Sequence, residues 1–86
     1  MSRCVKYQEM IANGDWLEAL RTIDAELSDD PEYTGAYFNI GLAFEKAGLL
    51  ELARMSYEYY LATYPQSYWA AEAGRRLSAL PPRNTG

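Results

Sequence analysis

Two helical patterns separated by a glycine lie within residues 34 to 67, in the stretch TGAYFNIGLAFEKAGLLELARMSYEYYLATYPQS. Apolar and small residues recur there at the three- and four-residue spacing of one helix face. These residues are Tyr37, Ile40, Gly41 and Phe44 in the first pattern, and Ala53, Tyr57, Tyr60 and Leu61 in the second. Gly48 is expected to end the first helix near Ala47, because glycine readily adopts the left-handed conformation past a helix end. Pro65 cannot continue the second helix, which we expect to end near Tyr64.

Gly41 stands in the interior of the first predicted helix. A glycine at such a position costs about 1 kcal/mol relative to alanine. A structural reason is therefore required, and close approach of the second helix would supply one. The small residue Ala53 is the expected neighbour at the point where the two helices cross.

A weaker copy of the pattern lies about 34 residues earlier in the chain, and a period of this size is typical of repeat architectures. At one common offset three residues with backbone or packing roles coincide: Gly14 with Gly48, Ala19 with Ala53, and Pro31 with Pro65. Tyr7, Met10 and Ile11 form an apolar stripe that stops at Gly14. The copy therefore predicts a second pair of helices, N-terminal to the first.

The polar residues between these helices suggest how each one starts. Asp15 and Glu18 have the spacing of a capping pair at the start of the helix after Gly14. Pro31 is expected in the first turn of the following helix, with Asp30 as its cap, because proline is favoured at that position.

Residues 34 to 67 resemble the tetratricopeptide repeat, a helix-turn-helix unit of about 34 residues. The matching residues are Tyr37, Asn39, Ile40, Gly41, Phe44, Gly48, Ala53, Tyr57 and Pro65. The resemblance implies an all-α fold of antiparallel helix-turn-helix repeats that form a short right-handed α-solenoid of five helices. A single domain is expected over residues 1–80, with repeat 1 at about 1–33, repeat 2 at about 34–67 and a capping helix at about 68–80. Residues 81–86 are expected to be a flexible tail.

The third unit begins with Pro65, Gln66 and Ser67 and is expected to stop after one helix. Its opening is similar to that of bacterial tetratricopeptide proteins, which hints at a bacterial source. The residues expected to pack this helix against repeat 2 are Ala70, Ala73, Gly74, Leu77 and Leu80. Polar residues on the two end faces favour a finished module over a slice of a longer array. These are Ser2, Lys6, Glu9 and Asn13 at one end, and Arg75, Arg76 and Ser78 at the other.

In this family the first helix of each pair lines a concave surface that usually binds a peptide or a partner helix. Carried onto this chain, the predicted groove consists of Gln8, Ile11, Phe38, Asn39, Leu42, Glu45, Trp69, Glu72 and Arg76, with Cys4 and Lys46 beside them. Phe38, Leu42 and Trp69 are large apolar groups outside the core stripe, and tryptophan is frequent at binding hot spots. The alternative is that Trp69 folds over repeat 2 and Phe38 fills a shallow groove. Asn39 likewise has the alternative role of a hydrogen bond within the helix packing.

Eight tyrosines give a second candidate surface. Tyr57, Tyr60, Tyr64 and Tyr68 recur at helical spacing and are expected to form a core and inter-repeat ladder. Tyr59 projects elsewhere and, with Trp16, is a candidate for a self-association patch.

Composition excludes several classes of function. The chain has 86 residues, no histidine and one cysteine, Cys4, so it lacks the usual catalytic base and cannot form an internal disulfide. A formal net charge of −4 argues against nucleic acid as a partner. No apolar run approaches the ~20 residues needed to span a bilayer, and no signal-peptide pattern occurs, which favours a cytoplasmic protein without membrane insertion.

Charge is divided unevenly along the chain. Residues 1 to 32 carry eight acids and three bases, a net charge of −5, and residues 33 to 86 carry four acids and five bases, a net charge of +1. Such a division favours basic partners for the N-terminal half, or head-to-tail association of copies. The acids near Asp30 lack the glycine and glutamate spacing of a calcium loop, so neither a metal site nor a cofactor is predicted.

Two functions follow from the sequence. The first is a non-catalytic protein–protein interaction module that holds a peptide or a partner helix in the groove. The alternative is a structural subunit that self-associates into a homo-oligomer through exposed aromatic residues or end faces. An enzyme is not expected, because no nucleophile lies in a pattern with a base.

Overall fold

The computed structural model describes residues 3 to 82, which form five helices. These are α1 (Arg3–Ala12), α2 (Trp16–Asp29), α3 (Gly35–Lys46), α4 (Leu50–Thr63) and α5 (Ala70–Ala79). The described part of the chain contains no strand, so the prediction of an all-α fold with five helices is confirmed. Residue Ser2 of the predicted end face and residues 83–86 of the predicted tail lie outside the described range, whereas Pro81 and Pro82 are exposed.

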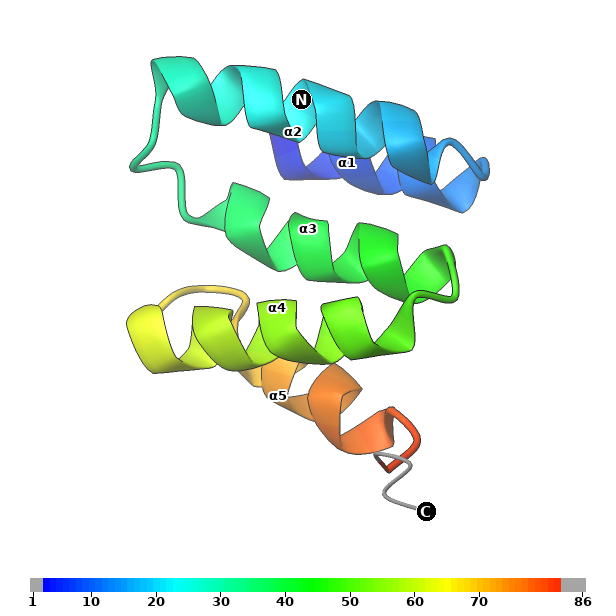
Figure 1. Cartoon of the computed structure of the whole chain (residues 1–86). Coiled ribbons are helices and arrows are strands. Elements are labelled where there is room, and N and C mark those ends of the chain that lie inside the picture. The colour runs from blue at the N-terminus through cyan, green and yellow to red at the C-terminus, as the bar shows by residue number, and fades with distance from the viewer. Residues whose placement is uncertain (1–2, 83–86) are drawn as a thin grey trace.

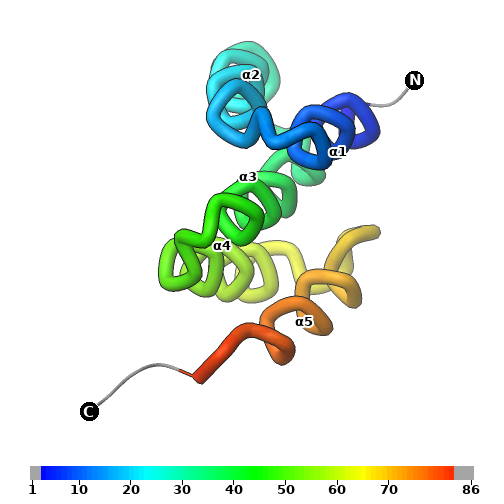
Figure 2. Tube along the Cα trace, turned by 90° about the vertical axis from the view of Figure 1, so that its right-hand side faces the viewer, coloured from blue at the N-terminus to red at the C-terminus, as the bar shows by residue number. Residues whose placement is uncertain are grey.

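Consecutive helices run in opposite directions and stack along one axis of the molecule (Figure 1). Seen along the helices, α2 and α4 lie toward one side of the stack, α1 and α5 lie toward the other, and α3 lies between them (Figure 2). This arrangement leaves α1, α3 and α5 as neighbours on one face of the molecule. No described helix combines the length and the apolar character that a membrane crossing requires.

The two glycine turns have matching geometry. Gly14 has a φ of 88° and Gly48 a φ of 79°, in the left-handed region where other residues are strained. At the first turn the Asp15 amide donates to the Met10 carbonyl at 2.8 Å, and at the second the Leu49 amide donates to the Phe44 carbonyl at 3.0 Å. The predicted helix ends at both glycines are therefore confirmed.

The helix starts differ from the sequence-based expectations. Asp15 precedes α2, but its side chain makes no capping hydrogen bond. The carboxylate of Glu18 instead faces Arg21, with Oε2 of Glu18 4.0 Å from Nη1 of Arg21. Helix α3 begins at Gly35, well past Pro31, so Asp30 does not cap it. The Asp30 carboxylate instead accepts a hydrogen bond from the Arg3 guanidinium at 2.9 Å. Residues 30–34 form a turn in which the Tyr33 amide donates to the Asp30 carbonyl at 3.2 Å.

Close helix packing at Gly41 is confirmed, with a different neighbour from the one expected. A Cβ atom added at Gly41 would lie 2.6 Å from Cε1 of the Tyr57 ring. Tyr57 is fully buried, and its hydroxyl donates to the Glu45 carboxylate at 2.7 Å. Ala53 is also fully buried, but the space beside Gly41 belongs to the aromatic ring of α4.

The tyrosine ladder is shorter than predicted. Tyr57 and Tyr60 are fully buried and Tyr64 is half-buried, whereas Tyr68 is 87% exposed. Tyr68 precedes the start of α5, so it does not continue the helical spacing that places the other rings in the core. The prediction of a core role for Tyr68 is therefore wrong.

Helix α5 packs on the α3–α4 pair as predicted. Ala73 is fully buried, Leu80 is buried, and Ala70 and Leu77 pack against the same core cluster. Gly74 is an exception, because no atom lies within 4 Å of the position its Cβ would take. On the opposite end face Glu9 is exposed, but Lys6 turns toward α2 and pairs with Glu26.

A polar cluster joins α1 to α2. Tyr7 is fully buried beside Ile23 and Ala36, and its hydroxyl donates to one oxygen of the Glu26 carboxylate. The Lys6 ammonium group donates to the other oxygen at 2.6 Å. These hydrogen bonds, from Lys6 and then Tyr7, hold the pKa of Glu26 below its ordinary value of 4.5.

Acid is expected to weaken this junction. Because the pKa of Glu26 is lower in the folded chain than in the unfolded chain, its contribution to stability is complete above pH 4.5. The contribution is lost as the pH falls from 4.5 through the lower folded pKa. We therefore expect the difference in melting temperature between the wild type and Glu26→Gln to shrink from pH 7 to pH 3, about the range in which carboxylates titrate.

The matched control for this measurement is Glu9→Gln, on the exposed side of α1. Its melting temperature should follow that of the wild type at every pH. A Glu26→Gln difference that is constant with pH would contradict the coupling of Glu26 ionisation to folding.

Candidate functional site

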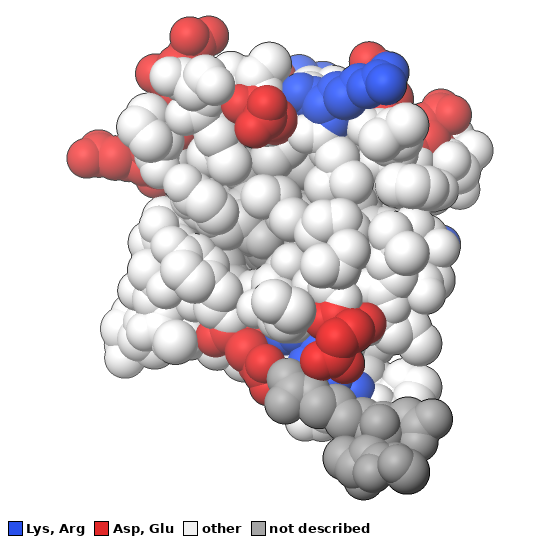
Figure 3. Space-filling model, in the orientation of Figure 1, with Lys and Arg blue, Asp and Glu red and all other residues white. Residues whose placement is uncertain are grey.

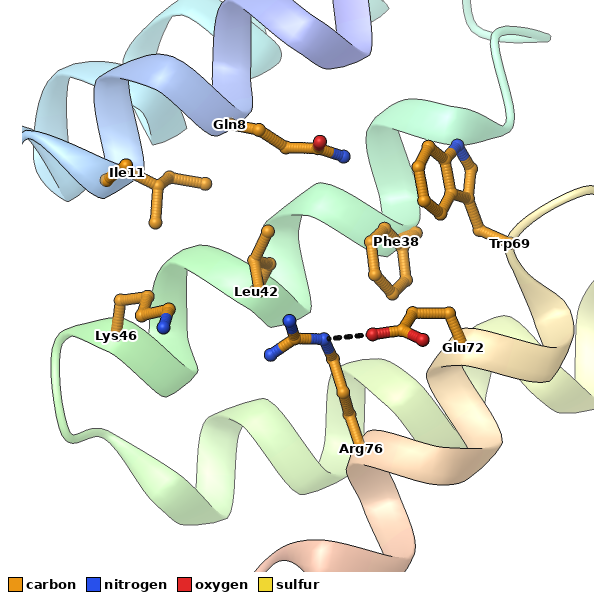
Figure 4. A pocket seen from close by; sticks show the side chains of 9 residues that line it. Gln8, Ile11, Phe38, Leu42, Lys46, Trp69, Glu72 and Arg76 are labelled. Atoms are coloured by element: carbon orange, nitrogen blue, oxygen red, sulfur yellow. Dashed lines mark hydrogen bonds and ion pairs between the residues drawn. The ribbon is translucent and has the colours of Figure 1, made fainter.

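A hollow of about 510 Å³ lies on the face shared by α1, α3 and α5 (Figure 4). We call it the groove, and its lining residues are Gln8, Ile11, Ala12, Phe38, Leu42, Lys46, Trp69, Glu72 and Arg76. Gln8 and Ile11 project from α1 toward α3, and Arg76 projects from α5 toward Leu42 (Figure 4). Three helices far apart in sequence therefore contribute to one concave surface.

Most of the predicted groove residues meet in this hollow. They are Gln8, Ile11, Phe38, Leu42, Trp69, Glu72 and Arg76. Ala12 was not predicted, although it falls on Lys46 at the same sequence offset that superimposes Gly14 on Gly48. Cys4 lines a neighbouring hollow instead. Whether a partner occupies the groove stays a prediction.

Phe38 and Leu42 form the floor of the groove. They are only 1% and 6% exposed, so the expectation that they lie outside the core is wrong. The Trp69 ring stacks on Phe38 with centroids 5.1 Å apart and planes 5° apart, and the Tyr57 and Tyr60 rings lie about Phe38 within the core. The alternative arrangement, with Trp69 folded over the α3–α4 pair, describes this structure.

Asn39 is not part of the groove surface. It is fully buried, and its side-chain amide donates to the Gly35 carbonyl at 2.8 Å, one turn earlier in α3. Its carbonyl oxygen, Oδ1, has no hydrogen-bond partner among the described residues. The alternative role of Asn39 in helix packing therefore matches its position, and its assignment to the groove is wrong.

Ion pairs occupy the α5 side of the groove. The Arg76 guanidinium donates to the Glu72 carboxylate at 2.9 Å and to the Glu45 carboxylate at 3.3 Å. Burial acts to lower the pKa of Arg76, but the charge of Glu45 and the other partners outweighs burial and raises it. Hydrogen bonding to Arg75 is the largest of the effects that lower the pKa of Glu72. Glu72 and Arg76 therefore stay charged and paired near neutral pH.

Glu45 lies beneath this network and is not a lining residue. Its carboxylate accepts hydrogen bonds from the Tyr57 hydroxyl at 2.7 Å and from Arg76. Burial, followed by this hydrogen bond, raises the pKa of Tyr57, which keeps the phenol neutral. Glu45 therefore links the buried Tyr57 of α4 to Arg76 at the rim of the groove. It was predicted as a groove residue, but it does not line the hollow.

Lys46 differs from the other charged groups of the groove. It is exposed at the end of α3 and makes no ion pair with any residue between 3 and 82. Because Glu72 and Arg76 pair with each other and with neighbouring charges, Lys46 leaves the rim with an uncompensated positive charge. A carboxylate of a bound partner would compensate it.

The opposite face of the molecule carries an apolar surface. A hollow of about 260 Å³, lined by Tyr37, Ile40, Leu52, Met55, Ser56 and Tyr59, lies between α3 and α4. Charged side chains gather toward the upper and lower edges of this face and leave an uncharged band over α3 (Figure 3). Tyr59 belongs to this surface, which we call the convex patch, whereas Trp16 packs against the core and does not line the hollow.

Comparison with known proteins finds no match: no family model, no curated protein and no solved structure is similar to this chain. The described residues bring no three His, Cys, Asp or Glu side chains together as a metal site requires. The groove and the convex patch are therefore the two candidate functional surfaces.

Proposed function

We propose that this chain is a non-catalytic protein–protein interaction module that binds a peptide or a partner helix in the groove. The observation that carries the proposal is the convergence of α1, α3 and α5 on one open hollow with an apolar floor and a charged rim. This combination is typical of surfaces that bury apolar groups of a partner and orient it by polar contacts at the edge.

We also propose that the fold is a short, right-handed solenoid of the tetratricopeptide class. Support comes from the two helix pairs and from their glycine turns, at Gly14 and Gly48, which share one hydrogen-bond pattern. A cytoplasmic location and a bacterial source belong to the same proposal, and the bacterial source rests on the sequence resemblance.

The groove favours binding over catalysis because its titratable groups are engaged with one another. The carboxylates of Glu45 and Glu72 both accept hydrogen bonds from Arg76, and Glu72 also binds Arg75. A carboxylate held in this way is a weak general base. Lys46, with its uncompensated charge, instead fits a partner that carries an acidic group next to its apolar anchor.

Proteins that co-purify with the tagged chain would identify candidate partners, and filling the groove tests whether they bind there. Ala12 is exposed and lines the groove at the last residue of α1. We expect Ala12→Arg to weaken partner binding by about tenfold or more, because the long side chain occupies the hollow. Isothermal titration calorimetry with the purified partner measures the change.

The matched control is Ala62→Arg, an exposed alanine near the end of α4 that does not line the groove. It makes the same change in charge and volume and should bind as the wild type does. Equal affinities of Ala12→Arg and the wild type, with melting temperatures unchanged, would refute the groove as the binding site.

The second candidate function is self-association, and the convex patch favours it. Leu52, Met55 and Tyr59 form an exposed apolar stripe on α4, next to the half-buried Tyr37 and Ile40. Contiguous apolar surface of this kind often marks an interface. If copies associate through it, sedimentation velocity should show a concentration-dependent shift that Met55→Glu removes. A monomer at every concentration would leave only the interaction module.

A further inference from the structure

A second hollow of about 520 Å³ lies beside the groove, and Trp69 lines both of them. Its lining residues are Cys4, Val5, Tyr33, Thr34, Gly35, Tyr60, Tyr68 and Trp69. Four of these residues are aromatic, and they come from three separate parts of the chain. We call this surface the aromatic hollow.

Tyr68 is the most exposed lining residue of the aromatic hollow and adjoins the half-buried Trp69. Tyr68 is 87% exposed, and its ring meets the Trp69 ring edge to face, with centroids 5.0 Å apart. Neither ring is needed to close the other side of the hollow, where Tyr60 is fully buried and accepts a hydrogen bond from Ser67. Because Phe38 covers one face of Trp69, the exposed Tyr68 ring is the aromatic surface of the hollow to which a cation is attracted.

The chain itself already places a cation next to this hollow. The Arg3 guanidinium lies 3.7 Å from the centroid of the Tyr33 ring and donates to the Asp30 carboxylate at 2.9 Å. One aromatic ring and one acid of the α2–α3 connection therefore hold one guanidinium group between them. Tyr33 lines the aromatic hollow, so this guanidinium group already occupies one of its rings, whereas no cation of the described residues lies over the exposed Tyr68 ring.

Charge in the segment that precedes Tyr33 also favours a cation. Asp29 and Glu32 flank the turn that leads into Tyr33; both are exposed, and neither forms an ion pair within the described range. The lining residues themselves carry no charged side chain. Because residues 1 to 32 have a net charge of −5, a positively charged segment is attracted to this end of the molecule.

We propose that the aromatic hollow binds an arginine side chain of a partner protein, with its guanidinium group on the exposed Tyr68 ring and attracted by Glu32, the exposed acid that precedes Tyr33. This site goes beyond the proposed function, because it attracts a positively charged group. The groove, with its unpaired Lys46, instead attracts a negatively charged one. A partner that used both surfaces would carry an acidic group at the Lys46 end and an arginine at the Tyr68 end.

Nuclear magnetic resonance tests the proposal on the full chain with a small probe. The chain has two tryptophans, and Trp16 lines neither the groove nor the aromatic hollow, so its indole N–H signal is an internal control. We expect N-acetyl-arginine amide to shift the Trp69 indole signal saturably and to leave Trp16 unchanged. N-acetyl-citrulline amide, which has almost the same shape without the charge, should bind several times more weakly.

Two variants locate the bound probe. Tyr68→Ala removes an exposed ring that lines the aromatic hollow and not the groove. Glu32→Gln removes a flanking charge, and Asp24→Asn removes an equal charge from α2 as the control. Tyr68→Ala should weaken binding of the arginine probe by about two- to fivefold, the size of an exposed cation–π contact. Glu32→Gln should weaken it by up to about fivefold, the size of an exposed ion pair, and Asp24→Asn should leave it unchanged.

The proposal is overturned if citrulline binds as well as arginine, or if Tyr68→Ala leaves the arginine titration unchanged. It is likewise overturned if Asp24→Asn weakens binding as much as Glu32→Gln, since the effect would then be one of net charge alone. None of these outcomes depends on a groove partner. Failure of the groove proposal and failure of this one are therefore read from different experiments.

Discussion

Replacing Phe38 by alanine is expected to lower the free energy of unfolding by about 3–5 kcal/mol, the usual cost of deleting a buried phenylalanine. The ring is 1% exposed and packs against the rings of Tyr57, Tyr60 and Trp69. These neighbours belong to α4 and to the start of α5, so the cavity would separate elements that Phe38 holds together. Urea denaturation followed by circular dichroism measures the loss.

Met55→Ala is the control for this prediction. Met55 is 55% exposed on α4, and truncation of a surface side chain usually changes stability by no more than about 0.5 kcal/mol. A small effect at Phe38, similar to that at Met55, would show that Phe38 is accessible. It would then be a contact residue of the groove, as the sequence suggested, and not its floor.

The burial of Phe38 also changes how the groove must be tested. A Phe38→Ala variant that fails to bind a partner is uninformative when the fold itself is weakened. Substitutions that add volume at the rim, such as Ala12→Arg, leave the core in place and act on the groove alone. They are therefore the sharper test of function.

Gly41→Ala is expected to destabilise the chain by about 1–3 kcal/mol, the usual cost of overpacking a core. The added Cβ would lie 2.6 Å from Cε1 of Tyr57, far inside van der Waals contact. The ring has little freedom to withdraw, because the hydroxyl of Tyr57 is bonded to Glu45 and its other side faces the core. This strain is expected to exceed the gain in helix propensity of about 1 kcal/mol.

Gly74→Ala is the matched substitution with the opposite expected sign. Gly74 lies inside α5, and nothing stands within 4 Å of the position its Cβ would take. We therefore expect stabilisation by about 0.5–1 kcal/mol, because alanine loses less conformational entropy than glycine in a helix. If both substitutions changed stability in the same direction, the assignment of close packing to Gly41 alone would be wrong.

The number of helices and most of their ends were predictable because local chemistry dictates them. Gly14 and Gly48 end helices through a backbone conformation that glycine adopts most easily, and this preference is visible in the sequence. The membership of the groove was also largely predictable, since helical spacing and the offset between the two copies place its residues on one face. Ala12 shows that the same offset contained more information than the prediction used.

Two wrong predictions, at Asp30 and Tyr68, have different causes. Aspartate often caps helices, but the carboxylate of Asp30 instead accepts a hydrogen bond from Arg3, 27 residues away in the sequence. In the sequence, Tyr68 continues the helical spacing of Tyr57, Tyr60 and Tyr64. In the structure it lies in the connection before α5 and is exposed. At Asp30 a contact with a distant residue replaces the expected cap, whereas at Tyr68 the local break at Pro65 ends the helical spacing before it reaches the ring.

Local residue preferences and periodicity in the amino-acid sequence determine that this chain is all-α, where its turns fall and which side chains share a face. Tertiary packing alone decides how deep each of those side chains lies. Phe38 and Leu42 project toward the groove as the period requires, yet they are buried because Trp69, the tyrosines of α4 and helix α5 close around them. Periodicity specifies a direction around one helix, whereas burial is set by what the rest of the chain places in that direction.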